Sequence, residues 1–131
     1  MKRTALLNIE LSQVVASMGH GDVLVIGDAG LPVPAGVRRI DLAVTQGVPS
    51  VAQVLQTVLS ELQVERAVIA QESVSANGEL PAWYSQQAGL PAPQTLSHDD
   101  FKALSLQAVA VVRTGEFTPY ANVALLSGVV F

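Results

Sequence analysis

The chain has no cysteine, little charge and few aromatic side chains. The absence of cysteine excludes disulfides, thiolate metal sites and cysteine nucleophiles. The formal net charge is −4 without any basic stripe, which argues against nucleic-acid binding. No apolar run approaches the ~18 residues that suggest a membrane-spanning helix. Near the N-terminus, Glu10, Ser12 and Gln13 come too early for the apolar region of a signal peptide, so we predict a cytoplasmic protein.

Several motifs that carry nucleotides, metals or nucleophiles are also missing. The sequence has no G-x-G-x-x-G, no P-loop, no G-x-S-x-G and no paired metal-ligand spacing. The segment 27–30 does follow a predicted strand, but Pro32 and Pro34 come next and prevent the helix N-terminus that phosphate binding needs. We therefore expect neither a bound metal nor a nucleotide cofactor.

The composition is that of a compact, aliphatic domain. Half of the 131 residues are apolar and 14% are charged, which excludes disorder driven by high charge and low hydrophobicity. This length fits one domain, and we predict a single domain over residues 1–131. A small domain with so few charges is expected to bury part of its surface against copies of itself, which predicts a homo-oligomer.

Apolar residues recur at helical spacing in several segments. Gly19 stands where the C-terminal glycine of a first helix is expected, and Ser50 is the predicted N-cap of a second. Ser97 is the predicted N-cap of a helix with Asp99 and Asp100 in its first turn. The predicted helices cover Asn8–Met18, Pro49–Leu62, a short stretch around Trp83–Gln87, and the residues after Ser97 through Leu104.

Short aliphatic runs alternate with these helices and predict strands buried on both faces. The predicted strands are Asp22–Gly27, Arg39–Val44, Arg66–Ala70, Ala108–Val112, and Asn122–Phe131 interrupted by Gly128. This alternation predicts an α/β fold, a single three-layer α/β/α domain with a largely parallel central sheet. Ligands of such sheets usually bind outside the carboxyl ends of strands. The loops after Ile26 and after Val112, and the glycine-rich turn before Asp22, are therefore candidate site segments.

Two polar residues near the first strand are candidates for chemistry. His20 lies between Gly19 and Gly21, and an imidazole donates and accepts protons near neutral pH. Alternatively, His20 interacts with the dipole at the end of the preceding helix. Asp28 ends the buried strand, where its carboxylate is able to accept two sugar hydroxyls. Its alternative role is to form the turn with Gly30.

A polar segment over residues 113–122 follows another strand. Tyr120 and Asn122 are two residues apart and point the same way if the segment is extended. Asn offers a donor and an acceptor, and Tyr adds a hydroxyl and a flat ring that suits a sugar; an ordinary loop with Pro119 in its turn also fits. His98, the second of two histidines, begins a predicted helix, where a surface role is the alternative.

These segments together resemble the D-ribose pyranase (RbsD/FucU) family. The matching blocks are GHGD at 19–22, DAGLPVP at 28–34, RIDLAVTQGVP at 39–49, RTGE at 113–116 and PYAN at 119–122. Their spacing fits from one end of the chain to the other. The segment 73–95 departs most from the family pattern, and no role is carried over there.

The resemblance implies an isomerase that interconverts the pyranose and furanose forms of D-ribose and feeds a sugar kinase, ribokinase, with the furanose. It places the proton donor on His20 and the sugar-binding positions on Asp28, His98, Tyr120 and Asn122. It further implies a homodecameric ring with the sugar site near a subunit contact, and a reaction without a cofactor.

Two other functions fit the same residues. A fucose mutarotase would exchange the anomers of a 6-deoxy sugar with much of the same site, although the Pro-Tyr-Ala-Asn block and the length are closer to the ribose branch. A non-catalytic ribose-binding module would need Asp28 and Asn122 but would have no use for His20.

Overall fold

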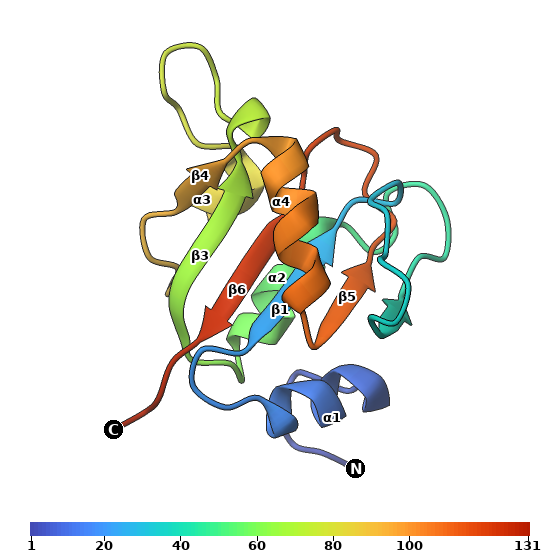
Figure 1. Ribbon diagram of the computed structural model, residues 1–131. Coiled ribbons are helices and arrows are strands. Elements are labelled where there is room, and N and C mark those ends of the chain that lie inside the picture. The colour runs from blue at the N-terminus through green and yellow to red at the C-terminus, as the bar shows by residue number, and fades with distance from the viewer.

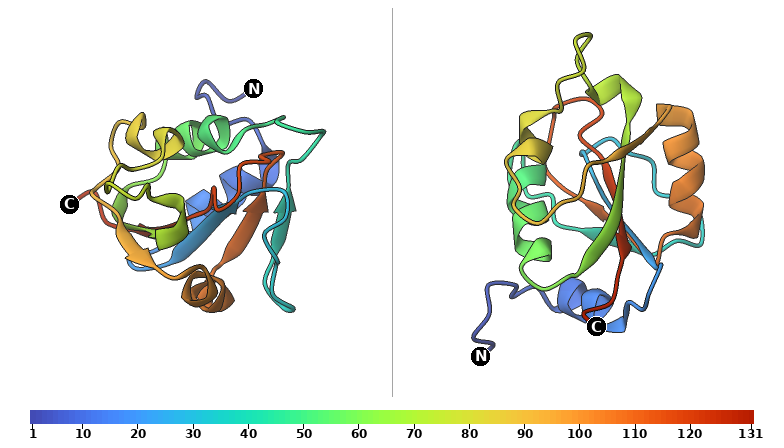
Figure 2. Two further views of the ribbon diagram at one scale, coloured as in Figure 1. Left: turned by 90° about the horizontal axis from the view of Figure 1, so that it is seen from above. Right: turned by 90° about the vertical axis from the view of Figure 1, so that its left-hand side faces the viewer.

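The computed structural model describes residues Met1–Phe131 as a six-stranded sheet with helices on both faces (Figures 1 and 2). The α-helices are α1 (Ile9–Ser17), α2 (Val51–Leu59), α3 (Ala82–Ser85) and α4 (His98–Leu104), with 3-10 turns at Gln71–Ser73 and Ser105–Gln107. The strands are β1 (Val23–Gly27), β2 (Arg39–Asp41), β3 (Val64–Ala70), β4 (Gln94–Leu96), β5 (Ala110–Arg113) and β6 (Val123–Ser127). None of the helices has both the length and the apolar character needed to cross a membrane.

The strand order is β2-β5-β1-β6-β3-β4, and the sheet is largely parallel as predicted. The exception is β6, which runs antiparallel to both β1 and β3. The segment between β5 and β6 contains no helix, and parallel strands need a long crossover connection. Because that crossover is missing, β6 returns in the opposite direction.

Alternating side chains of β1 enter two separate cores. Leu24 and Ile26 pack in a cluster with residues of α1 and α2, whereas Val23 and Val25 pack in a second cluster with Phe101 of α4. All five residues of β1 are buried because helices cover both faces of the sheet. Figure 2 shows α2 and α3 on one face and α4 on the other, which confirms the three layers.

The local capping predictions hold in two helices. The Ser50 side chain accepts a hydrogen bond from the Gln53 amide and Gln53 returns one to the Ser50 amide, a complete capping box. The Ser97 side chain accepts a hydrogen bond from the Asp100 amide. Gly19 follows the end of α1, but positive φ occurs at Gly21 (83°) instead. In the turn that carries His20, the residue with a left-handed backbone is therefore Gly21, directly after the histidine.

Two strand predictions need correction, and one strand was not predicted. The strand from Arg39 ends at Asp41, because Leu42 and the following residues turn back through a bridge between Thr45 and Val48. The last strand ends at Ser127 and does not reach Phe131. The strand β4 was not predicted; Gln94 and Thr95 are exposed, and this edge strand depends on pairing with β3.

Candidate functional site

Polar residues gather where β1 and β5 end and where β6 begins, at the upper end of the sheet in Figure 1. We call this the carboxyl edge. Ile26 pairs with Val112 of β5 and Val123 of β6, so Asp28 and Asn122 emerge side by side although they are distant in sequence. The N-terminus of α4, with His98, follows β4 at this edge.

Asn122 is the buried centre of the carboxyl edge. It is 0% exposed, and its Oδ1 accepts a hydrogen bond from the Asp28 amide at 2.8 Å. Gly27 makes this approach possible, because a Cβ at that position would lie 3.0 Å from Asn122 Oδ1 and 2.5 Å from Leu31 Cδ2. Asn122 Nδ2 is buried and makes no hydrogen bond within the chain. A buried donor without a partner is costly, which favours a ligand at this atom.

Asp28 has the turn role that its sequence context suggested, because its Oδ1 accepts a hydrogen bond from the Gly30 amide at 2.9 Å. The carboxylate also borders a pocket of about 400 Å³, a size within the range of small-molecule sites. Glu116 and Thr118 line the same pocket, together with Ala29, Gly30, Arg113, Phe117 and Pro119. The turn role and a ligand role are thus compatible for Asp28.

Tyr120 and His98 form an edge-to-face pair at the same edge. Their ring centroids are 5.0 Å apart and their planes are inclined by 77°. His98 Nδ1 is buried without a hydrogen-bond partner in the chain, and both carboxylate oxygens of Glu72 accept from the His98 amide. Tyr120 has φ of 61°, in the left-handed region that non-glycine residues avoid. Strain of this kind is found preferentially at functional sites.

Arg113 links two segments beside the pocket through hydrogen bonds, although we did not predict it as a site residue. Its Nε donates to the carbonyl of Ala29 at 3.0 Å, and its Nη1 contacts both oxygens of Asp41 at 3.2 Å. The pKa of the Asp41 carboxyl lies below its usual range because the Ala43 amide and Arg113 donate to it. The polar segment after β5 was a visible signal, but the partners of Arg113 depend on the tertiary structure.

His20 lies at the opposite edge of the sheet, which we call the amino edge. Here β1 and β3 begin and β6 ends, at the lower end of the sheet in Figure 1. His20 precedes β1 whereas Asp28 follows it, and the strand between them spans about 13 Å at roughly 3.3 Å per residue. The His20 imidazole contacts Glu65, with Nε2 and Oε2 2.9 Å apart. One chain therefore brings together Asp28, His98, Tyr120 and Asn122, but not His20.

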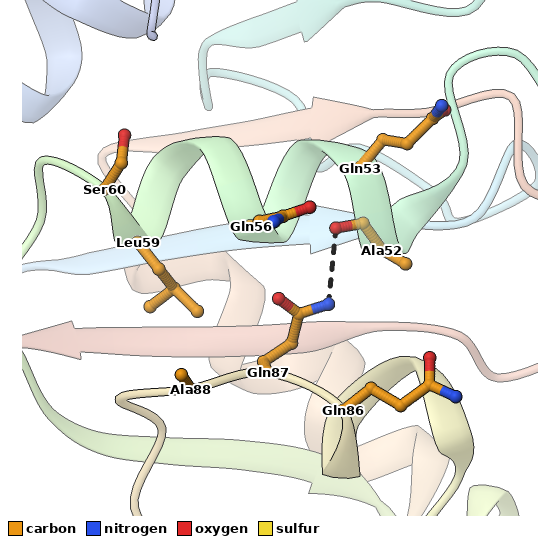
Figure 3. Close-up of a pocket in the computed structure, with 8 residues that line it drawn as sticks. All are labelled: Ala52, Gln53, Gln56, Leu59, Ser60, Gln86, Gln87 and Ala88. Atoms are coloured by element: carbon orange, nitrogen blue, oxygen red, sulfur yellow. Dashed lines mark hydrogen bonds between the residues drawn. The ribbon is translucent and has the colours of Figure 1, made fainter. Parts of the chain in front are cut away.

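A second pocket lies between α2 and the segment that includes α3 (Figure 3). Four glutamines, Ser60 and aliphatic residues line it: Ala52, Gln53, Gln56, Leu59, Ser60, Gln86, Gln87 and Ala88. Gln87 Nε2 donates to the Ala52 carbonyl across it at 3.4 Å. No lining residue titrates, so this pocket has no group that moves a proton. Elsewhere, no cluster of three or more His, Asp or Glu side chains is placed to hold a metal ion.

Known proteins resemble this chain over nearly its whole length. Residues 1–130 match the model of the RbsD / FucU transport protein family. The chain is 62% identical to a D-ribose pyranase of Variovorax paradoxus and 63% identical to one of Paracidovorax citrulli, each over the full length of both chains.

Solved structures show the same fold. The structure of Bacillus subtilis RbsD complexed with D-ribose superposes with a TM-score of 0.87 at 43% identity and full coverage of both chains. A fucose mutarotase from Streptococcus pneumoniae in complex with L-fucose has a TM-score of 0.81 at 24% identity, again over both full chains. That second likeness concerns the fold alone.

Proposed function

Because this chain belongs to the RbsD/FucU family, we propose that it is a D-ribose pyranase, an isomerase that interconverts the pyranose and furanose forms of D-ribose. The observation that carries this function is identity of 62–63% with D-ribose pyranases over the whole chain. The likeness to the fucose mutarotase is much more distant in sequence.

The chemistry needs proton transfer and orientation of hydroxyls. Ring opening requires a proton for the ring oxygen while another leaves the anomeric hydroxyl, and closure through a different hydroxyl produces the other ring. No redox step occurs, so the reaction needs no cofactor. Acid–base assistance of about 10²–10⁴-fold is typical of a positioned side chain. We assign His20 as the proton donor.

The carboxyl edge supplies the groups that hold the sugar. Asn122 Nδ2 and His98 Nδ1 are buried without partners in the chain, and sugar hydroxyls would satisfy both atoms. Asp28 offers a carboxylate and Tyr120 a hydroxyl at the same edge. Hydrogen-bond donors and acceptors of this kind suit a neutral, polyhydroxylated ligand.

The separation of His20 from this edge supports a site shared between copies. We propose that the His20 of a second copy reaches the carboxyl edge of the first, in a homo-oligomer for which a decameric ring is our specific proposal. Exposed apolar side chains on several elements favour such association: Ile9, Val44, Val48, Leu106, Phe117, Val130 and Phe131. A cytoplasmic location, where ribokinase takes up the furanose, completes the proposal.

Magnetisation transfer by NMR between the anomeric signals of ribopyranose and ribofuranose tests the reaction. We expect faster exchange with the parent protein and loss of the acceleration in His20→Ala. Acceleration with L-fucose but not with ribose would favour a fucose mutarotase. Ribose binding without any acceleration would favour a binding module.

Mixed oligomers test the shared site. His20→Ala and Asp28→Asn are inactive separately if each removes one half of every site. Unfolded together and refolded at equal amounts, they recover about a quarter of the parent rate, because random neighbours form some sites with both native residues. A mixture as inactive as its components would show that both residues must come from the same copy, which would overturn the shared site.

A further inference from the structure

Glu65, at the start of β3, holds the imidazole of His20 at the amino edge. Its Oε2 lies 2.9 Å from His20 Nε2, although the two residues are 45 positions apart in sequence. This is the one hydrogen bond that the imidazole makes within the chain. Both side chains are about half exposed, and an ion pair as exposed as this contributes little to stability. The consequence of the contact is therefore the orientation of the ring.

The backbone around Glu65 contains a β-bulge that turns the Glu65 side chain toward His20. Val64 pairs with Ser127, whereas Arg66 pairs with Leu126, so Glu65 is the extra residue of a β-bulge. Bulges redirect side chains at the ends of sheets and beside active sites. Gly128 faces the bulge, and a Cβ there would lie 3.0 Å from the Glu65 Cβ. Because residue 128 has no Cβ, the Glu65 side chain fits against the end of β6.

The turn that carries His20 is anchored without help from the imidazole. Asp22 Oδ2 accepts from the Gly19 amide at 2.8 Å, and the Gly21 amide donates to the Ser127 carbonyl at 2.8 Å. The Ser127 hydroxyl donates to the Gly19 carbonyl. Since the neighbours of His20 are glycines, no adjacent side chain restricts its ring. Hydrogen bonds therefore hold the backbone of this turn, and the contact with Glu65 orients the His20 ring.

We propose that Glu65 is a positioning residue for proton transfer by His20. Its carboxylate accepts the hydrogen bond of Nε2–H, keeps the ring in that tautomer, and leaves Nδ1 to exchange the proton with the sugar. In ring opening, Nδ1–H of the imidazolium gives its proton to the ring oxygen as the C1–ring oxygen bond breaks, the anomeric hydroxyl loses its proton to water as the carbonyl forms, and the neutral Nε2–H form of the ring remains. In the reverse direction, Nδ1 takes that proton back. This inference rests on the assignment of His20 as the proton donor.

Kinetics of Glu65 variants test the proposal. We expect Glu65→Ala to lower kcat by about tenfold and to leave KM for ribose unchanged, because Glu65 acts through His20 and does not hold sugar. Glu65→Gln keeps an acceptor for Nε2–H and should retain more activity than Glu65→Ala. Glu10→Gln, which changes an exposed carboxylate in the first turn of α1, is the matched control with parent kinetics.

A double variant separates this inference from the function on which it rests. If Glu65 acts only through His20, His20→Ala with Glu65→Ala is no slower than His20→Ala alone. A slower double variant, or Glu65→Ala with the parent kcat, would overturn the role of Glu65 while leaving His20 as donor. Full activity of His20→Ala would instead end the assignment of the donor itself.

Two physical measurements complete the test. With only two histidines in the chain, ¹⁵N spectra of the parent and of His20→Ala assign the His20 ring. We expect the Nε2–H form in the neutral ring, kept in Glu65→Gln; a dominant Nδ1–H form in the parent protein would refute the proposal. Size exclusion should give Glu65→Gln the elution volume of the parent. A fall in kcat that accompanies dissociation would make Glu65 a contact between copies instead.

Discussion

The side chain of Asn122 and the backbone of Asp28 are joined by a hydrogen bond of 2.8 Å across 94 positions of sequence. Through this bond the start of β6 holds the end of β1 in register at the carboxyl edge. The same amide group has a second atom, Nδ2, that is buried and unpaired within the chain. The Asn122 side chain therefore stabilises the fold through Oδ1, and its Nδ2 is available to a ligand.

Asn122→Ala should affect stability and sugar binding together. The Asp28 amide loses its acceptor, and leaving this partly buried donor unsatisfied costs about 1–3 kcal/mol in the free energy of unfolding. Urea unfolding measures this loss, and KM for ribose should rise in the same variant. Asn77→Ala, in an exposed loop, is the control and should change stability by less than about 0.5 kcal/mol. Equal stability of Asn122→Ala and the parent would contradict this account of the edge.

Gly27→Ala should lower both the stability of the fold and the affinity for ribose. The added methyl group would lie 2.5 Å from Leu31 Cδ2 and 3.0 Å from Asn122 Oδ1. Overpacking of this kind costs about 1–3 kcal/mol, and the displaced Asn122 should bind ribose less well. At Gly30 an added Cβ has an ordinary contact of 3.6 Å with Asp28 Oδ1. Gly30→Ala is thus the matched control, and similar melting temperatures for the two variants would count against the predicted clash.

Tyr120 should be important for binding and unimportant for stability. Tyr120→Phe keeps the ring against His98 and removes one neutral hydrogen bond to sugar, so KM should rise about three- to tenfold. Its free energy of unfolding should stay within about 0.5 kcal/mol of the parent, because the hydroxyl makes no hydrogen bond within the chain. Tyr120→Gly relieves the positive φ but removes the ring, so its KM should rise further. A KM unchanged in both variants would remove Tyr120 from the site.

Tyr84 should make the fold sensitive to alkaline pH. Burial raises the pKa of its phenol from 10.0 to about 12, and the hydroxyl donates to the Pro91 carbonyl at 2.5 Å. Between these two values the folded protein holds a proton that the unfolded chain has lost. The folded state binds more protons, so stability falls as pH rises through this interval, by about 2–3 kcal/mol in total.

Urea unfolding at about pH 9 and about pH 12 measures this slope. Tyr84→Phe should be less stable than the parent at neutral pH, because it loses the hydrogen bond, but should lack the extra alkaline loss. Tyr120→Phe, which alters the other tyrosine, should keep that loss. If Tyr84→Phe and the parent lost stability equally as the pH rises, the loss would come from other titrating groups.

The interior strands and most helices follow from local patterns. The continuous aliphatic run of β1 predicts a strand with helices on both sides, and Ser50 and Ser97 mark helix starts because their side chains cap amides within one turn. By contrast, β4 is short, polar and exposed, and exists through its pairing with β3. Pairing across the chain leaves no periodic signal in a segment of three residues.

The sequence alone determined the α/β class, the buried strands and the identity of the polar candidates, because apolar periodicity and residue chemistry are local properties. The tertiary structure decided which candidates meet. Strand register joins Asp28 to Asn122 and places His20 at the opposite edge, beside a glutamate that a bulge in β3 turns toward it. Neither relationship is visible locally, because each depends on how strands distant in the chain align within one sheet.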